Sequence, residues 1–442
     1  MKRKTPLNFK NNEELEVMRK YKKRSDENFC IEKGFYPLGS CTMKYNPRIN
    51  EYCANLEKLL NIHPSQKDEE VQGALEIMYK LQESLKEITG MSGVSLQPCA
   101  GAHGELTGMM IIKKYFEKKG EERKKVIVPD SAHGTNPMSA AMCGYEIIQI
   151  KSNEKGLVNI EELKKVLDKN VAGLMLTNPN TLGLFEEEIL EISKIMHENG
   201  SLLYYDGANF NAIMGHTNPK KMGFDVVHLN LHKTFSTPHG GGGPGAGPVC
   251  VIEELKDYLP NPIVEFDGEK YYRNYKIKNS IGKVSTFFGN FSVLIRAYTY
   301  ILSYGNQLRN VSSKAVLNAN YIMENLRNEF DIANSGKCMH EFVICGEKQK
   351  EKGVSTLQMA KRLMDFDIHP PTIYFPLIIH ESMMIEPTES ENKETLDNFI
   401  NVMKEIAKEV DENPVNFENY PSKTPIKKAD ETLAARNLNL RN

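Results

Sequence analysis

The alternation of short apolar segments with amphipathic ones between residues 76 and 255 limits the fold of this chain more than any other feature. Helical periodicity covers residues 105–119 and 186–200, and Asn159 with Glu162 forms a capping-box pattern that predicts a further helix start. Apolar runs typical of buried strands occupy residues 126–128, 145–150, 171–176, 202–205 and 226–231. Short strands separated by helices predict an α/β fold, with a mostly parallel sheet and helices on both of its faces.

The flanking regions predict a division into domains. Residues 1–75 are polar and rich in turn signals, so we expect an extended N-terminal arm. The large domain is predicted over 76–310, with a long helical stretch at 291–308. Mixed elements over 311–412 predict a smaller C-terminal α/β domain, and the proline-containing segment 413–442 is expected to be an extended tail.

Composition narrows the class of protein. The 56 Lys and Arg residues nearly balance the 58 Asp and Glu residues, so charge gives no support for binding to nucleic acid or to an anionic membrane. The basic N-terminus lacks the apolar run of a signal peptide, and no segment has the apolar length of a membrane span. The eight cysteines include no Cys-x-x-Cys and no cluster with histidines. We therefore predict no metal site, and we expect reduced thiols in the cytoplasm, with Cys41 a small unpaired residue rather than a nucleophile.

Polar residues fall at the predicted strand ends. Residues 177–181 follow one strand, 206–208 follow the next, and His232 and Lys233 follow a third. The carboxyl ends of parallel strands form the ligand-binding edge of such sheets. The pattern therefore predicts a site there.

Lys233 lies between an apolar segment and a loop with four consecutive glycines, 240–243. An amine withdrawn from solvent can form a Schiff base with a carbonyl. Asp206, 27 residues earlier, also ends a predicted strand, so it could hold the pyridine nitrogen of pyridoxal phosphate protonated while Lys233 binds the aldehyde. Ala208 would project on the same side of the segment and leave room for the ring. The alternative for Asp206 is a turn-forming aspartate before glycine.

A phosphate site is expected where 98–105 leads into the predicted helix, because Gly101 and Ala102 let an anion approach the first N–H groups. His103 could then lie on the face of the ring, although a histidine beside a glycine turn is more often a turn residue. His232 is interpreted as a supporting residue, a base or a phosphate contact; His133 and His239 are weaker candidates. A nucleotide-binding loop is excluded, because no Gly-Lys pair is followed by Ser or Thr.

Several long motifs resemble those of one family, glycine decarboxylase, the P protein of the glycine cleavage system. The similar segments are residues 37–47, 100–105, 130–137, 206–209, 232–245, 369–376 and 385–389. The chain resembles the second, lysine-bearing half of that protein, which is a separate subunit 2 in some organisms. The resemblance implies a fold type I (aspartate-aminotransferase-like) architecture and a pyridoxal 5'-phosphate held as an aldimine on Lys233. It also implies that Asp206 binds the pyridine nitrogen, that His103 stacks on the ring and that Gly101 and Ala102 lie near the phosphate.

The same resemblance implies an activity and partners. The expected reaction is decarboxylation of glycine with transfer of the aminomethyl group to the lipoyl arm of the H protein. The expected assembly is a heterotetramer with two copies each of subunit 1 and of this chain. Two alternatives remain: another fold type I decarboxylase or aminotransferase that acts without a carrier protein, and a non-catalytic scaffold for subunit 1.

Overall fold

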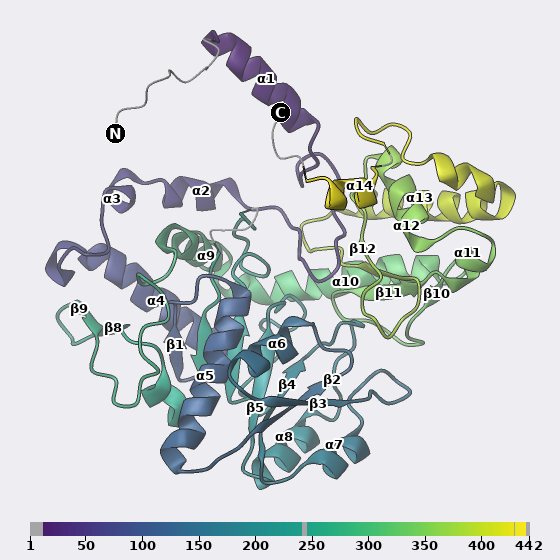
Figure 1. Cartoon of the computed structure of the whole chain (residues 1–442). Helices are drawn as coiled ribbons and strands as arrows, with labels where there is room; N and C mark the ends of the chain where they lie inside the picture. Colours follow the sequence, from purple (N-terminus) through teal and green to yellow (C-terminus); the bar gives the residue numbers. More distant parts are fainter. Residues whose placement is uncertain (1–11, 241–244, 428, 439–442) are drawn as a thin grey trace.

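A computed structural model describes residues 12–240, 245–427 and 429–438. These residues form a large lobe around a seven-stranded sheet and a smaller lobe around a four-stranded sheet (Figure 1). The strands of the large sheet, in spatial order, are β1 (Gly93–Ser95), β7 (Val249–Val251), β6 (Val226–Leu229), β5 (Leu202–Gly207), β4 (Val171–Thr177), β2 (Lys125–Pro129) and β3 (Glu146–Ile150).

The large sheet is mostly parallel, as the sequence predicts. Strands β3, β2, β4, β5 and β6 pair in parallel, whereas β7 runs antiparallel to both β6 and β1. Each predicted strand is present with small shifts at its ends. The largest shifts are two residues: β5 ends at Gly207 instead of position 205, and β6 ends at Leu229 instead of position 231, where Leu231 N–H bonds the carbonyl of Ala246 across the following turn.

Helices cover both faces of this sheet. Residues 171–176 of β4 and all of β5 are buried, and successive strand residues point to opposite faces, so both faces must be covered. The helices in contact with the sheet include α5 (Gly101–Lys119), α6 (Thr135–Met142), α7 (Ile160–Val166) and α8 (Ile189–Glu198). The predicted start of α7 is confirmed, since the Asn159 side chain accepts the N–H groups of Glu161 and Glu162. Helix α5 begins four residues before the predicted position 105, and this places its first turn beside β6.

The smaller lobe has an antiparallel sheet with strand order β10 (Asp331–Ile332), β11 (Phe342–Cys345), β13 (Ser382–Ile385) and β12 (Thr372–Ile373). Its core includes residues of α10 (Leu308–Leu326), α12 (Thr356–Leu363) and α13 (Lys393–Glu412). The predicted helix over 291–308 is two helices, because α9 (Phe291–Tyr304) ends at Gly305 and α10 begins three residues later. Helix α10 joins the lobes: Val311 lies in the larger core, and Ala319 and Leu326 lie in the smaller one.

The N-terminal region differs from the expected extended arm because it contains helices. Helix α1 (Glu14–Asp26) has no buried residue and projects away from both lobes (Figure 1). Phe35 enters the core of the smaller lobe, and α2 (Arg48–Ala54), α3 (Glu57–Leu60) and α4 (Gln72–Thr89) follow along the large lobe. In the described part of the chain, no helix combines the length and apolarity that crossing a membrane requires.

The C-terminal segment also contains structure that its prolines did not predict. A 3₁₀ helix (Pro414–Asn419) places Phe417 in the core of the smaller lobe, and α14 (Glu431–Arg436) follows. The connection between these two helices is bound by Asp365, whose carboxylate accepts the N–H groups of Ser422 and Lys423 at 2.7–3.0 Å. The same carboxylate lies 3.3 Å from Arg362 Nη1.

We predict that Asp365→Asn lowers the free energy of unfolding by about 1–3 kcal/mol, because the neutral amide weakens hydrogen bonds that the buried carboxylate accepts. Burial alone would raise the pKa of Asp365, but these N–H donors and Arg362 lower it overall. The stabilisation by ionised Asp365 is therefore complete above pH 3.8, its ordinary pKa. It is lost as the pH falls through the lower pKa that Asp365 has in the folded protein.

Urea unfolding followed by circular dichroism measures this effect. Asp367→Asn is the matched control, because Asp367 is exposed and asparagine tolerates its left-handed backbone (φ 56°). An equal loss in both variants would contradict the role of Asp365.

Candidate active site

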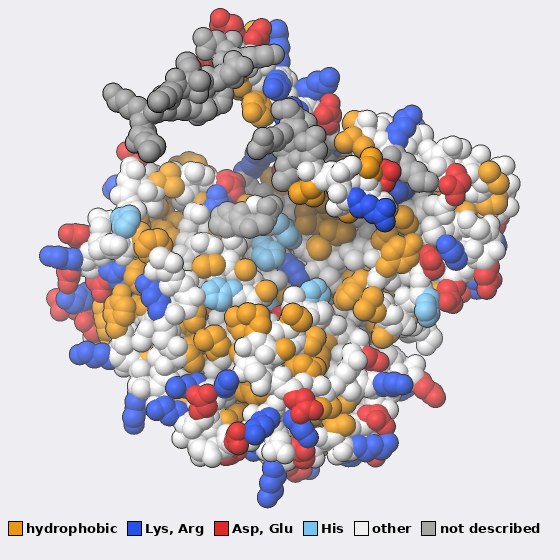
Figure 2. All heavy atoms as spheres, viewed as in Figure 1, with side chains coloured by type: hydrophobic (Ala, Val, Ile, Leu, Met, Phe, Trp, Pro, Cys, Tyr) orange, Lys and Arg blue, Asp and Glu red, His pale blue; other side chains and the backbone are white. Residues whose placement is uncertain are grey.

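A cavity lies where β4, β5 and β6 end. The sheet register aligns Thr177 with Asp206 and Asp206 with His228, so the three residues form a row across neighbouring strands. All three line the cavity together with Lys233. Ser40 and Glu341 also line it, so the N-terminal segment and the smaller lobe complete the walls. The space-filling view shows this face hollowed between the lobes, with histidine side chains around the hollow (Figure 2).

Asp206 is the buried anion of this cavity, with 4 % of its surface exposed. Its Oδ2 accepts the Asn136 amide at 2.8 Å, and its Oδ1 accepts the Ala208 N–H at 3.0 Å. Burial alone would raise the pKa of Asp206, but His228, Asn136, the Ala208 N–H and Lys233 together hold it below its ordinary value. Asp206 therefore stays ionised at neutral pH.

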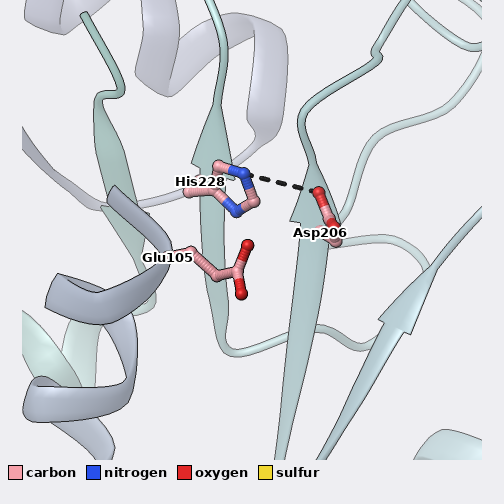
Figure 3. A group of neighbouring side chains, drawn as sticks. All are labelled: Glu105, Asp206 and His228. Carbon is pink, nitrogen blue, oxygen red and sulfur yellow. Dashed lines mark ion pairs between the residues drawn. The ribbon is translucent and has the colours of Figure 1, made fainter. Parts of the chain in front are cut away.

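His228 supports Asp206 from the neighbouring strand. Its Nε2 lies 3.4 Å from Asp206 Oδ1, and its Nδ1 lies 2.6 Å from the hydroxyl of Tyr204 (Figure 3). Burial lowers the pKa of His228, so the ring is neutral and carries one proton. The arrangement fits the tautomer in which Nε2–H points to Asp206 and Nδ1 accepts the Tyr204 hydroxyl.

Glu105 is a second carboxyl beside Asp206, and sequence reasoning noted it only as a helix residue. It extends from the first turns of α5 toward Asp206 and His228 (Figure 3). Burial, together with the charge of Asp206, raises the pKa of Glu105 to about 7. Its Oε2 accepts the Thr135 hydroxyl at 2.9 Å. The two carboxyls thus differ in acidity because Asp206 receives the stronger donors.

Lys233 lies in a turn directly after β6. Its N–H bonds the carbonyl of Asn230 at 3.2 Å, and its carbonyl accepts the N–H of Ser236, which has a left-handed backbone (φ 56°). The completely buried Phe235 anchors this turn in the larger core. The turn therefore directs the Lys233 side chain into the cavity. The run of four glycines that follows Lys233 is described only at Gly240, because residues 241–243 lie outside the described part of the chain.

The start of α5 forms another wall of the cavity, through Gly101 and Ala102. A Cβ at Gly101 would lie 1.9 Å from Asn230 Oδ1, so any larger residue there would require the Asn230 side chain to move. Gly247 also packs here, since a Cβ would lie 2.0 Å from the Ala100 carbonyl. The close packing leaves the first N–H groups of α5 facing a narrow space, which suits an anion such as phosphate.

The candidate histidines lie in different surroundings. Neither His103 nor His232 is among the described residues that line the cavity. His103 Nδ1 accepts the Cys99 N–H at 3.2 Å, and His232 packs against His239 with ring centroids 4.8 Å apart. His133 does line the cavity, beside Asp206 and Lys233. Its placement depends on the β2–α6 connection, a long-range feature that local sequence does not reveal.

Two of the sequence motifs meet behind the cavity. Thr42 donates its N–H and hydroxyl to Glu386 at 3.0 and 2.6 Å. Lys44 forms a buried ion pair with Glu389 at 2.7 Å and also bonds the hydroxyl of Tyr300 at 3.1 Å. Cys41, which precedes Thr42, forms no disulfide, and burial raises the pKa of its thiol to about 11, which agrees with its interpretation as an unreactive residue.

These groups fit pyridoxal phosphate. Lys233 supplies an amine for the aldehyde, Asp206 supplies a carboxylate for the pyridine nitrogen, and the start of α5 supplies N–H groups for the phosphate. Five polar atoms of the cavity walls lack a hydrogen-bond partner among the described residues, namely Glu105 Oε1, Thr177 Oγ1, Asn230 Oδ1 and both ring nitrogens of His340. Such atoms are expected where a polar ligand completes the site.

Known proteins similar to this chain share one family. Residues 1–274 match the family model of the glycine cleavage system P-protein, and residues 311–430 match that of the glycine dehydrogenase C-terminal domain. The chain is 58% identical over 434 residues to a probable glycine dehydrogenase (decarboxylating) subunit 2 of Chloroherpeton thalassium, with 97% of this chain and 88% of that protein covered. It is 59% identical over 426 residues to the protein of the same name from Caldanaerobacter subterraneus, with 96% and 88% covered.

Solved structures agree on the fold. A glycine decarboxylase (P-protein) in inhibitor-bound form superposes with a TM-score of 0.75 at 18% identity, covering 91% of this chain and 92% of that one. A glutamate decarboxylase from Lactobacillus brevis gives a TM-score of 0.71 at 13% identity, covering 93% and 96%. The α/β architecture is thus that of fold type I pyridoxal phosphate enzymes. With matching models over both lobes and close relatives along almost its whole length, the chain belongs to the glycine cleavage system P-protein family.

Proposed function

We propose that this chain is the cofactor-bearing subunit of a glycine dehydrogenase that decarboxylates glycine and transfers the aminomethyl group to a lipoyl arm. One observation carries the proposal: Lys233 and the buried, ionised Asp206 share a cavity in a chain that closely resembles glycine dehydrogenase subunit 2. When bound, pyridoxal phosphate supplies an electron sink for the pair released as CO2 leaves.

The residues of the cavity divide this task. Lys233 holds the aldehyde carbon of the cofactor, Asp206 keeps the pyridine nitrogen protonated, and Ala208, two residues later, leaves space for the ring. Gly101 and Ala102 bind the phosphate. His103 and His232 act from outside the cavity lining as supporting residues, and the position of His133 supports it as the residue against the ring.

Water must be excluded after CO2 departs. The electron pair left on the glycine carbon has to form a bond to a lipoyl sulfur, whereas a proton from water would give methylamine. Walls from the large lobe, the N-terminal segment and the smaller lobe surround the cavity and limit the access of water.

The partners follow from the family and from one exposed surface. Tyr45, Ile49, Tyr52, Leu56 and Leu60 recur every three to four residues from the segment before α2 to the end of α3, and each is between 40% and 67% exposed. An apolar stripe of this kind is typical of a protein–protein interface. We place subunit 1 on this stripe, in a heterotetramer of two copies of each subunit that receives a lipoylated H protein. Eight unpaired cysteines support a cytoplasmic location.

The decisive experiment is exchange of labelled CO2 into glycine, measured with this chain alone, with subunit 1, and with lipoylated H protein. We expect full exchange only in the complete mixture, and none with Lys233→Ala, which also loses the visible absorbance of the bound cofactor. Lys221→Ala is the control, because Lys221 is exposed and absent from the cavity lining. Equal exchange by the chain alone, with release of a free amine or keto acid, would instead indicate a decarboxylase or aminotransferase without a carrier.

A second prediction separates the two histidines. His133→Ala should weaken cofactor affinity about two- to tenfold, the value of about 0.5–1.5 kcal/mol expected for a stacked ring. His103→Ala should change it less than about twofold, because its ring nitrogen is engaged by the Cys99 N–H. Titration of the cofactor-free chain with pyridoxal phosphate measures both, and the opposite order would identify His103 as the stacking residue.

The interface predicts a third outcome. Tyr52→Asp should weaken association with subunit 1 about thirtyfold, since losing a central tyrosine anchor costs about 2 kcal/mol. Leu190→Asp is the control, because Leu190 is similarly exposed (65%) but lies on α8. Analytical ultracentrifugation of the mixed subunits measures the change. Unaltered association of Tyr52→Asp would place subunit 1 elsewhere.

A further inference from the structure

A second cluster of buried ionisable groups has no role in the steps above. His340, Glu341 and Glu386 are 1%, 3% and 0% exposed, and their potential ligand atoms all lie within 4.8 Å of one another. His340 and Glu341 line the same cavity as Lys233. The cluster therefore faces the reacting groups from the smaller lobe.

Strand register explains the closeness of the two glutamates. Strands β11 and β13 are antiparallel, with Phe342 opposite Ile385. Glu341 precedes β11 and Glu386 follows β13, so continuing the register places the glutamates opposite each other. Two carboxyls brought together in a buried place cannot both ionise without a large electrostatic penalty.

Hydrogen bonding distinguishes the two carboxyls. Glu386 accepts three bonds, from the Thr42 N–H, the Thr42 hydroxyl and the Asn209 amide, at 2.6–3.0 Å. Glu341 accepts the Ser40 N–H at 2.8 Å on Oε2. Its Oε1 lies 3.7 Å from His340 Nε2, and neither ring nitrogen of His340 has a hydrogen-bond partner among the described residues. The described residues thus supply three donors to Glu386 and one to Glu341.

Burial and the neighbouring charges together favour the protonated form of Glu341. Burial raises the pKa of Glu341 well above its ordinary value, and Glu386 raises it further, while the Ser40 N–H and Lys233 oppose this. Burial also lowers the pKa of His340, so the ring is neutral and supplies no counter-charge. Glu341 is therefore a carboxylic acid at neutral pH, facing the cavity.

The proposed reaction needs such an acid. As CO2 leaves, the glycine carbon forms a bond to one lipoyl sulfur, the S–S bond breaks, and the second sulfur takes its electron pair. The carbon is oxidised and the disulfide is reduced. The departing sulfur must then gain one proton to become a thiol, so each turnover consumes a proton.

We propose that Glu341 donates this proton to the departing lipoyl sulfur. The proposal rests on the aminomethyl transfer proposed above. After donation, Glu341 is a carboxylate opposite Glu386, and the repulsion between them favours its reprotonation from solvent. Glu105, the other cavity carboxyl with a raised pKa, lies against Asp206 at the cofactor-binding end and bonds Thr135, which leaves Glu341 as the acid on the smaller-lobe side.

The test is Glu341→Gln in the complete enzyme with glycine and lipoylated H protein. Glutamine keeps the shape but lacks the acidic proton, so formation of the lipoyl thiol should fall about 10²-fold or more. Glycine decarboxylation should continue, with more methylamine as product, and cofactor absorbance should be retained. Glu341→Asp, which keeps an acid, should recover part of the transfer even if the glutamine variant folds poorly.

Infrared spectroscopy of the cofactor-free chain gives a readout independent of activity. The carbonyl stretch of protonated carboxyls should be present at neutral pH, and Glu341→Gln should remove the component of Glu341 while those of Glu105 and Glu391, whose pKa values are raised to about 7, remain. Glu391→Gln is the matched control: burial raises the pKa of Glu391 to about 7, but Glu391 does not line the cavity, so thiol formation should stay unchanged.

The outcomes separate the two proposals. Wild-type enzyme without glycine exchange would refute the aminomethyl-transfer function, whatever Glu341 does. Normal exchange together with wild-type thiol formation in Glu341→Gln would refute the role of Glu341 alone. Stoichiometric binding of zinc that Glu341→Gln abolishes would also overturn it, because the cluster would then be a metal site.

Discussion

The site depends on keeping one buried carboxylate ionised. Moving a carboxylate out of water carries a penalty of several kcal/mol, so Asp206 requires donors from several parts of the fold. Asn136 comes from α6, the Ala208 N–H from the end of β5, and His228 from β6, with Tyr204 fixing the ring of His228. Strand order brings these groups to one point. The parallel sheet therefore brings together the groups that keep Asp206 ionised. Lys233 can act on the cofactor only together with this carboxylate.

The N-terminal segment connects this sheet to the smaller lobe. Lys44 is completely buried, and its amine bonds Glu389, the Thr234 carbonyl beside Lys233, and Tyr300. Burial lowers the pKa of Lys44 and Glu389 opposes this, so removing either partner would leave the other charge without compensation. Thr42 and Glu386 make a second connection. The walls of the cavity thus come from three separate segments of the chain, held together by buried polar contacts rather than by apolar packing alone.

Sequence reasoning succeeded where the signal is local. Alternating patterns identify β4, β5 and β6, and polar residues at their ends place Asp206 and Lys233 in one cavity. It could not place His133 or Glu341, because their positions depend on crossover connections and on the register of a second sheet. Turn signals in the first 75 residues suggested extended chain, yet α1, α2 and α3 form there. Helices α1 and α3 have no buried residue and α2 spans only seven residues, so no buried apolar stripe marks them in the sequence.

Two carboxyl pairs share the cavity region, and the same physical rule separates their acidities. Asp206 with Glu105 and Glu386 with Glu341 are each close in a buried place. Burial and the neighbouring carboxyl raise the pKa of one member in each pair, that of Glu105 to about 7 and that of Glu341 well above its ordinary value. A reaction that must keep a ring nitrogen charged and also protonate a sulfur needs a stable anion and a protonated acid at separate positions. Pairing carboxyls provides both, because the different surroundings of the two members decide which one serves each task.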